Sequence, residues 1–233
     1  VNAIGIIKQL AESHNRYLSV AINSWLPHWL ARWCAESNSR LIHISTDCVF
    51  TGKQGNYVET DLSDAQDLYG QSKHLGETDE QEPGAVTLRT SIIGRELQDP
   101  GHGLVEWFLS QQGQRIRGYE HAIFTGLTTH ELARVIARVV SQHPQLTGTW
   151  HVSAPPISKY DLLQLVRDIY HVDITIDPDT KFYCDRSLNS TRFQEATGYR
   201  CPAWPELIQQ MHADTIPYED CKRHYRDLTA KWK

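Results

Sequence analysis

Apolar residues along this chain occur in two patterns, short uninterrupted runs and repeats with helical spacing. Three runs with few charges predict buried strands, at residues 1–7, 40–46 and 85–93. Apolar residues spaced three and four apart predict a helix at 20–35, and shorter helices are expected at 67–77 and 104–111. Strands that alternate with helices predict a parallel sheet with both faces covered.

The second half of the chain continues with two helices that have clear start signals. Thr128 and Glu131 have the spacing of a capping box, and an apolar face follows them as far as Val140. A short strand at 150–153 and a Pro-Pro loop lead to Ser158, which is expected to cap the next helix. Beyond residue 170 the predicted elements become shorter.

These patterns predict an α/β fold with a doubly wound, parallel, Rossmann-like sheet that lacks its first strands. No clean linker divides the chain, so a second domain would be interleaved with the first. We expect the sheet domain over residues 1–96, with the segment of about 122–146 returning to it. Residues 97–233 are expected to form mainly a smaller, substrate-binding domain.

Composition excludes several classes of function. The net charge of −5 and the lack of long basic blocks argue against nucleic-acid binding. The five cysteines are scattered without a C-x-x-C pair, and the twelve histidines form no ligand motif, so we expect no metal and a reducing compartment. No run approaches about 18 apolar residues, so no membrane span is expected. We therefore expect a cytoplasmic protein.

Three oxygen-bearing side chains end the second predicted strand, in the sequence LIHISTDCVF. Ser45, Thr46 and Asp47 could simply turn the chain, because such residues satisfy nearby main-chain groups. In open parallel sheets, however, ligands bind beyond the carboxyl ends of the strands. This position makes the three residues candidates for chemistry.

Tyr69 and Lys73 stand four residues apart on the helix predicted at 67–77. This spacing places the phenol and the ammonium on one helix face, where a lysine favours the phenolate and lowers the tyrosine's pKa. The spacing alone is weak evidence, since Tyr218 and Lys222 repeat it near the C-terminus. No Ser/Thr-rich strand end precedes that second copy, so we interpret it as a solvated helix face.

In combination these motifs resemble the extended short-chain dehydrogenase/reductase superfamily. The stretches HISTDCVFTGKQGNYVETD, LYGQSKHLGE and LRTSIIG are most similar to dTDP-4-dehydrorhamnose reductases and related nucleotide-sugar reductases. The resemblance implies a reductase that uses NADP or NAD to reduce a nucleotide-linked 4-keto sugar, in deoxysugar or surface polysaccharide biosynthesis.

The resemblance also implies roles for individual residues. Tyr69 would be the general acid, Lys73 would lower its pKa and bind the nicotinamide ribose, and Thr46 would hydrogen-bond the reacting oxygen. Strand packing is the competing explanation for most of the remaining positions. The implied cofactor contacts are Asn2, Ala3, Gly5, Ser45, Tyr69, Lys73, Thr90 and Ser91, and the implied substrate contacts are Lys8, Thr46, Asp47 and Ile92.

The sequence departs from related families at three places. Cys48 stands where sugar 4,6-dehydratases have an acid, which argues against dehydration. Ile92 and Ile93 replace an aromatic residue of the rhamnose-pathway reductases, so the sugar stays open. The Gly-rich turn that seats a pyrophosphate is absent, so we expect further residues upstream and weak NAD(P)H binding by this chain alone.

Two other functions stay open from the sequence. A nucleotide-sugar epimerase would need the same residues, and a non-catalytic subunit that regulates a methionine adenosyltransferase resembles these reductases. The presence of Thr46, Tyr69 and Lys73 favours an enzyme. Trp25, Trp29 and Trp33 form a stripe expected in the core or at a subunit contact, the latter consistent with a homodimer.

Overall fold

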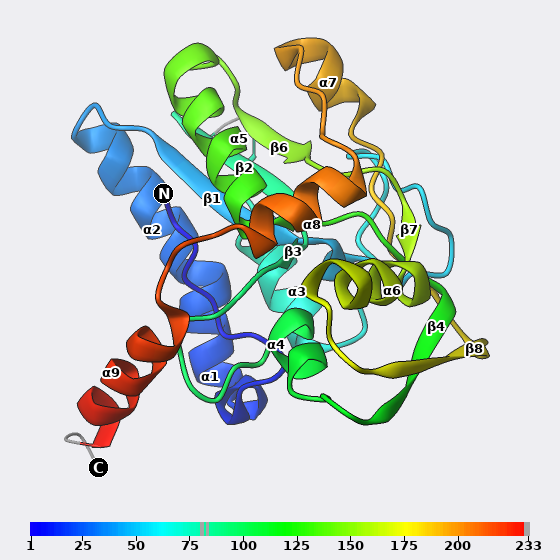
Figure 1. Ribbon diagram of the computed structural model, residues 1–233. Helices are drawn as coiled ribbons and strands as arrows, with labels where there is room; N and C mark the ends of the chain where they lie inside the picture. Colours follow the sequence, from blue (N-terminus) through cyan, green and yellow to red (C-terminus); the bar gives the residue numbers. More distant parts are fainter. Residues whose placement is uncertain (80–81, 83, 231–233) are drawn as a thin grey trace.

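The computed structural model describes residues 1–79, 82 and 84–230 and has a parallel sheet at its centre (Figure 1). Its strands are β1 (Leu41–Thr46), β2 (Ala85–Thr90) and β6 (Gly148–His151), in the order β1-β2-β6. All neighbours in this sheet are parallel, so the carboxyl ends of the three strands lie at one edge. The expected α/β class with a parallel sheet is confirmed.

The strand expected at residues 1–7 is wrong apart from Asn2. The main chain of Asn2 pairs with β1, donating to Ile42 O at 2.8 Å and accepting from Ile44 N at 3.0 Å. Val1 and Ile4 are 70% and 58% exposed. Because a strand is stabilised by neighbours along its whole length, an apolar run that contacts β1 at one residue does not continue as a strand.

A long helical segment follows, built from α1 (Arg16–Ser19), a π-helical stretch η2 (Val20–Trp25) and α2 (Leu26–Glu36). A 3-10 turn, η1 (Ala11–His14), precedes it. The helix expected at 20–35 is therefore confirmed. The Trp stripe does not lie in the core, because Trp25, Trp29 and Trp33 are 67%, 43% and 53% exposed. The π stretch instead buries Asn23 and Ser24.

Helix α3 (Leu68–Leu75) packs on β1, as does α2. The Asp67 side chain caps α3 by accepting from Gly70 N at 2.7 Å, and the helix ends at Gly76. The short helix expected at 67–77 is confirmed. A 3-10 turn, η3 (Asp47–Val49), connects the end of β1 to the loop before α3.

A second sheet lies apart from the parallel one and was not predicted. It contains β7 (Ile157–Ser158), β4 (Arg115–Phe124) and β8 (Thr175–Asp185), with β4 in the middle. Both long strands carry many charged and exposed residues, and β8 contains Pro178, so neither shows an apolar run. The two-residue strands β3 (Ile92–Ile93) and β5 (Leu127–Thr128) form a further parallel pair.

The remaining helices complete a core shared by both halves of the chain. Thr128 and Ser158 cap α5 and α6 as predicted, since their side chains accept from Glu131 N and Asp161 N. Strand β6 lies outside the segment expected to return to the sheet, yet it pairs with β2. The helices are α4 (Leu104–Leu109), α5 (Thr129–Gln142), α6 (Lys159–Tyr170), α7 (Thr191–Thr197), α8 (Trp204–His212) and α9 (Tyr218–Ala230).

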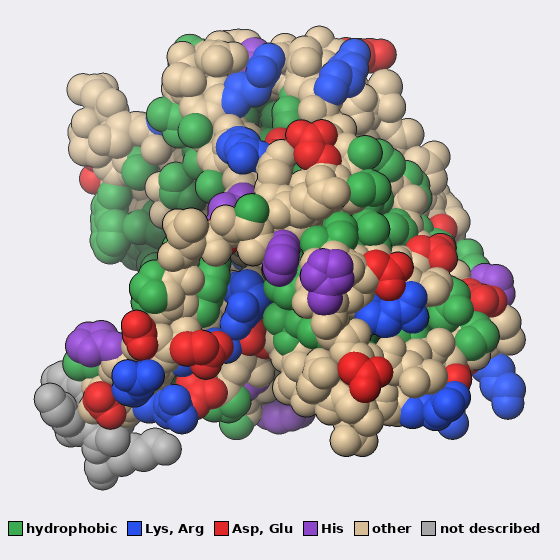
Figure 2. All heavy atoms as spheres, in the orientation of Figure 1, with side chains coloured by type: hydrophobic (Ala, Val, Ile, Leu, Met, Phe, Trp, Pro, Cys, Tyr) green, Lys and Arg blue, Asp and Glu red, His purple; other side chains and the backbone are tan. Residues whose placement is uncertain are grey.

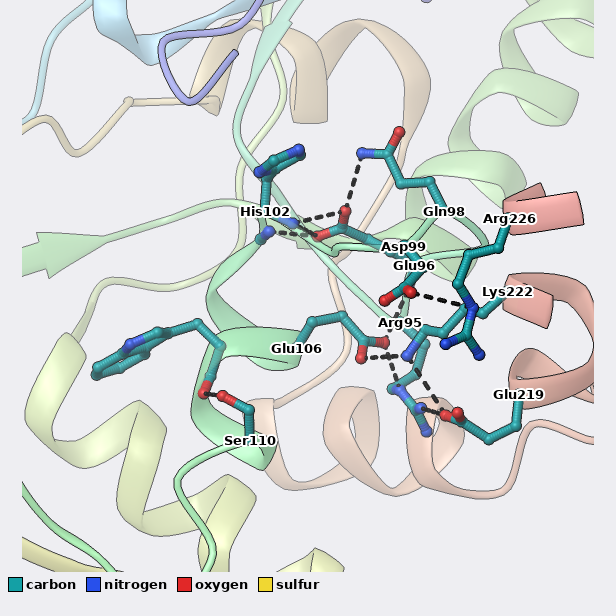
Figure 3. A network of polar contacts seen from close by, with 12 residues as sticks. Arg95, Glu96, Gln98, Asp99, His102, Glu106, Ser110, Glu219, Lys222 and Arg226 are labelled. Carbon is teal, nitrogen blue, oxygen red and sulfur yellow. Dashed lines mark hydrogen bonds and ion pairs between the residues drawn. The ribbon is translucent and has the colours of Figure 1, made fainter. Parts of the chain in front are cut away.

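The second Y-x-x-x-K copy is not a solvated helix face, so that interpretation is wrong. Tyr218 is 8% exposed and its hydroxyl donates to the Asp214 carboxylate. Lys222 Nζ lies 2.7 Å from Glu106 Oε2, and Glu106 also binds Arg95 (Figure 3). The first turn of α9 therefore packs into a polar network, while acidic and basic side chains mix on its outer surface (Figure 2).

Candidate active site

The candidate site begins where β1 ends, at Thr46 and Asp47. The Thr46 hydroxyl accepts from Cys48 N at 3.1 Å and donates to Asp47 Oδ1 at 3.2 Å, which holds the turn η3 in place. Thr46 and Asp47 are both buried. Burial raises the pKa of Asp47, although the Arg186 guanidinium opposes this.

Tyr69 lies in the first turn of α3 and interacts with the Thr46 hydroxyl. The helix reaches this position because Gly70 packs directly on the turn, where a Cβ would lie 2.3 Å from Cys48 O. The pKa of Tyr69 is raised, chiefly by burial and then by the neighbouring Cys48 and Asp47, while Thr46 lowers it. The phenol therefore keeps its proton at neutral pH.

Lys73 lies one turn further along α3 and is 4% exposed. Its Nζ donates to Ile44 O at 2.7 Å and lies 3.4 Å from His43 Nε2, so it is directed at β1. Burial lowers the pKa of Lys73 to about 8, although Glu77 opposes the change. The expected lowering of the Tyr69 pKa by Lys73 is not seen in this arrangement.

A buried ion pair fixes the far end of α3 against the sheet. Glu77 Oε1 accepts from Ser45 Oγ at 2.6 Å, and both Glu77 oxygens bind Arg89. Arg89 Nη1 also lies 3.2 Å from His151 Nε2. Burial would raise the pKa of Glu77, but the bonds from Arg89, His74 and Ser45 lower it to about 2. The Glu77 carboxylate thus ties the end of α3 to β1 and β2, and Arg89 extends the network to β6.

The predicted substrate contacts lie in different surroundings. Lys8 Nζ forms an ion pair with Asp67 Oδ2 at 2.8 Å and lies 5.6 Å from the centre of the Tyr69 ring. Lys8 and Asp47 therefore lie beside the Thr46–Tyr69 pair. Ile92 is 51% exposed, at the start of β3. Cys48 stays a thiol, since burial and Asp47 raise its pKa to about 11.

The side chains of three predicted cofactor contacts are already hydrogen-bonded to other groups of the protein. The Asn2 amide faces His43, Ser45 donates to Glu77, and Thr90 donates to Ser91 O. Of the other four besides the buried Lys73, Ala3 is exposed, and Gly5, Tyr69 and Ser91 are partly exposed. The Lys73 amine, by contrast, is turned toward β1.

Sequence reasoning missed His43, Glu77 and Arg89, which surround Lys73 and Ser45. A signal was present, because His43 and Arg89 interrupt two otherwise apolar strands, and buried charged residues require partners. Over the residues that the structure describes, no group of three or more His, Cys, Asp or Glu residues could hold a metal ion.

Comparison with known proteins connects this arrangement to a family. The family described as the RmlD substrate binding domain matches residues 8–215 of the chain. The chain belongs to this family. None of the helices found within residues 1–79, 82 and 84–230 has the length and apolar content that a membrane span needs.

Curated relatives of this RmlD-family chain include both enzymes and a regulatory subunit. The spore coat polysaccharide biosynthesis protein SpsK of Bacillus subtilis is 30% identical over 203 residues, 81% of this chain and 69% of that protein. A Mycobacterium tuberculosis dTDP-4-dehydrorhamnose reductase is 44% identical over 90 residues, 36% of this chain and 29% of that protein. Methionine adenosyltransferase 2 subunit beta of Danio rerio is 32% identical over 143 residues, 58% of this chain and 44% of that protein.

Solved structures show the same fold. The dTDP-4-dehydrorhamnose reductase of Clostridium acetobutylicum superposes with a TM-score of 0.76 at 22% identity, covering 90% of this chain and 78% of that chain. The Bacillus anthracis reductase, solved in complex with NADP, gives a TM-score of 0.75 at 20% identity, with the same two coverages. The RmlD-family chain therefore shares the fold of these two proteins.

Proposed function

We propose that this chain provides the catalytic part of an NADP- or NAD-dependent reductase that acts on a nucleotide-linked 4-keto sugar. The observation that carries the proposal is the grouping of three side chains: the Thr46 hydroxyl acts on the pKa of Tyr69, and Lys73 is buried one helical turn away. Membership of the RmlD family supports a sugar nucleotide as substrate. The NADP of the Bacillus anthracis neighbour and the name of SpsK support the cofactor and a polysaccharide pathway.

In this proposal Tyr69 donates a proton to the carbonyl oxygen of the sugar, and Thr46 holds that oxygen by a hydrogen bond. The raised pKa of Tyr69 ensures that the phenol carries its proton before the reaction. Bound reduced nicotinamide would supply the hydride, and Lys73, Ser91 and the main chain at Ala3–Gly5 would hold it. The pair of Lys8 and Asp67 beside the Tyr69 ring would limit how the sugar enters.

A regulatory role is the second candidate, because methionine adenosyltransferase 2 subunit beta is 32% identical over 143 residues. A regulatory subunit would have no chemical need for an acid that is paired with a hydroxyl and a buried lysine. Turnover therefore separates the two functions.

The test compares two tyrosine variants in the intact protein. Tyr69→Phe keeps the ring and removes the proton, so kcat for reduction of a dTDP-linked 4-keto sugar should fall by about 10² to 10⁴. Tyr218→Phe removes a hydroxyl from the distant Asp214 contact and should leave kcat within about twofold. Equal turnover by both variants would contradict the assignment and favour the regulatory role.

A further inference from the structure

Asn2, His43 and Lys73 form a chain of contacts inside the protein, on the side of Lys73 that faces β1. Asn2 Nδ2 lies 3.1 Å from His43 Nδ1, and His43 Nε2 lies 3.4 Å from Lys73 Nζ. The three residues are 2%, 0% and 4% exposed. Water therefore does not compete for these contacts, and each polar atom must be matched by its neighbour.

The orientation of the Asn2 amide determines which ring nitrogen of His43 carries a proton. Asn2 Oδ1 accepts from Ile4 N at 3.1 Å, so the NH₂ group is the one that faces the imidazole. An amide nitrogen donates only, hence His43 Nδ1 must accept. Because a neutral imidazole carries one N–H, the proton lies on Nε2.

This tautomer places an N–H donor against the side-chain nitrogen of Lys73. Nζ already donates to Ile44 O at 2.7 Å. An amine at Nζ has a lone pair that accepts from His43 Nε2, whereas an ammonium has none and meets a second donor. The contact is therefore satisfied only when Lys73 is uncharged.

We propose that His43 is a positioning residue which, held by Asn2 with its Nε2–H toward Lys73, favours the amine form of that lysine. The part of Lys73 in catalysis rests on the proposed function. After Tyr69 has given its proton to substrate, the phenolate must regain one. Transfer of a proton from the Lys73 ammonium through a water molecule would leave Tyr–OH and a Lys73 amine. His43 stabilises the amine and so lowers the cost of that return.

The charged groups around Lys73 do not remove this effect. Glu77, at the end of α3, favours the ammonium, but it is bound by Arg89 from β2 and Ser45 from β1. His43 itself stays neutral, because its pKa is lowered to about 3, first by burial and then by Lys73. Glu77 and the Asn2 main chain oppose this change, and His28 on α2 adds to it.

The first experiment needs no substitution, so it cannot fail through misfolding. Nitrogen-15 NMR of the histidine rings in the unaltered protein at pH 7 should show His43 with an unprotonated Nδ1 and a protonated Nε2. The signal is assigned by its loss in His43→Leu or, if that variant does not fold, through the ring–backbone correlations. A proton on Nδ1 would overturn the proposal, because Nε2 would then accept from the ammonium.

The second experiment measures the titration of Lys73 directly, with carbon-13 labelled lysine and assignment by Lys73→Arg. His43→Leu removes the donor without adding an acceptor, so the midpoint of Lys73 should rise by about one pH unit. A fall in the midpoint would indicate that His43 accepts from Lys73, and an unchanged midpoint would indicate no coupling; either overturns the proposal.

His151→Leu is the matched control. His151 is as buried as His43, at 0% exposure, but its Nε2 faces Arg89 Nη1 at 3.2 Å. The Lys73 midpoint should move by less than about 0.3 pH unit in this variant. Neither titration measures turnover, so the tautomer assignment can fail while Tyr69→Phe still lowers kcat as predicted, and the converse also holds.

Discussion

Arg89 holds Glu77 through two parallel hydrogen bonds, from Nε to Oε1 at 2.7 Å and from Nη2 to Oε2 at 2.6 Å, and both side chains are 5% exposed. Removing one partner of a buried pair leaves the other charge without compensation. We expect Glu77→Gln to reduce the free energy of unfolding by about 3 to 5 kcal/mol at pH 7, measured by urea unfolding. Glu36→Gln, which breaks the exposed Arg32 pair, should cost less than about 1 kcal/mol.

The lowered pKa of Glu77 predicts how the free energy of unfolding depends on pH. Its folded pKa, about 2, is below the ordinary value of 4.5, so its stabilisation is complete above pH 4.5 and is lost as the pH falls toward 2. The unfolding free energy should therefore fall more steeply between pH 4.5 and 2 in the unaltered protein than in Glu77→Gln. Parallel curves for the two proteins would contradict the lowered pKa.

Lys73→Met should separate activity from stability. The folded pKa of Lys73 is about 8, below the ordinary 10.5, so the buried ammonium destabilises the native state at neutral pH, and this cost disappears as the pH rises from 8 to 10.5. We expect Lys73→Met to abolish reduction and to leave the Tm at pH 6 equal to or above that of the unaltered protein. Lys222→Met, which breaks the buried contact with Glu106, should lower the Tm instead.

Because the Trp stripe is exposed, truncating one of its residues should reduce the stability of a single chain only slightly. Trp29 is 43% exposed, whereas Trp204 is 6% exposed and donates to Pro155 O. Trp29→Ala should cost about 1 kcal/mol or less, and Trp204→Ala about 3 to 5 kcal/mol. The homodimer stays a prediction; if it forms through this stripe, light scattering should show a smaller particle for Trp29→Ala alone.

Gly70 sets the distance between α3 and the end of β1. A Cβ there would lie 2.3 Å from Cys48 O and 2.6 Å from the Ala65 side chain, so Gly70→Ala must move the helix. We expect kcat to fall by at least about tenfold, because Tyr69 would no longer meet Thr46. Gln71→Ala, at the exposed neighbouring position, should retain activity; comparable losses in both variants would contradict this explanation.

The sequence predicted best where a pattern is local. The caps Thr128 and Ser158 and the helix around Tyr69 depend on residues within one or two turns, and each is found in the structure. Strand β8 was missed because its stability comes from pairing with β4, about 60 residues away, rather than from its own apolar content. Tyr218 was misjudged for the same reason, since Asp214 and the packing around α9 decide its burial.

The side chains that contact Lys73 and Glu77 were only partly predictable from the sequence. His43 and Ser45 occupy alternate positions of β1 and meet Lys73 and Glu77, which are four residues apart in the chain. The strand period of two and the helix period of about 3.6 were both available from the sequence. The sequence did not show which face of β1 meets α3, because the packing of the helix across the sheet decides this.

The π-helical stretch makes the loop beside Tyr69 dependent on the length of the helix that packs against α3. Within η2, Asn23 binds both main-chain groups of Ile6, at 2.8 and 3.0 Å, and Ser24 donates to Ser72 O at 2.8 Å. A π turn contains one residue more than an α turn, so deletion of a single residue within 20–25 would restore regular winding. The helix on either side of the deletion would keep its orientation, because the wide turn is what absorbs the extra residue. The side chains within the stretch would move instead, so Asn23 would release Ile6, and a deletion here would alter the loop beside Tyr69 without changing Tyr69 itself.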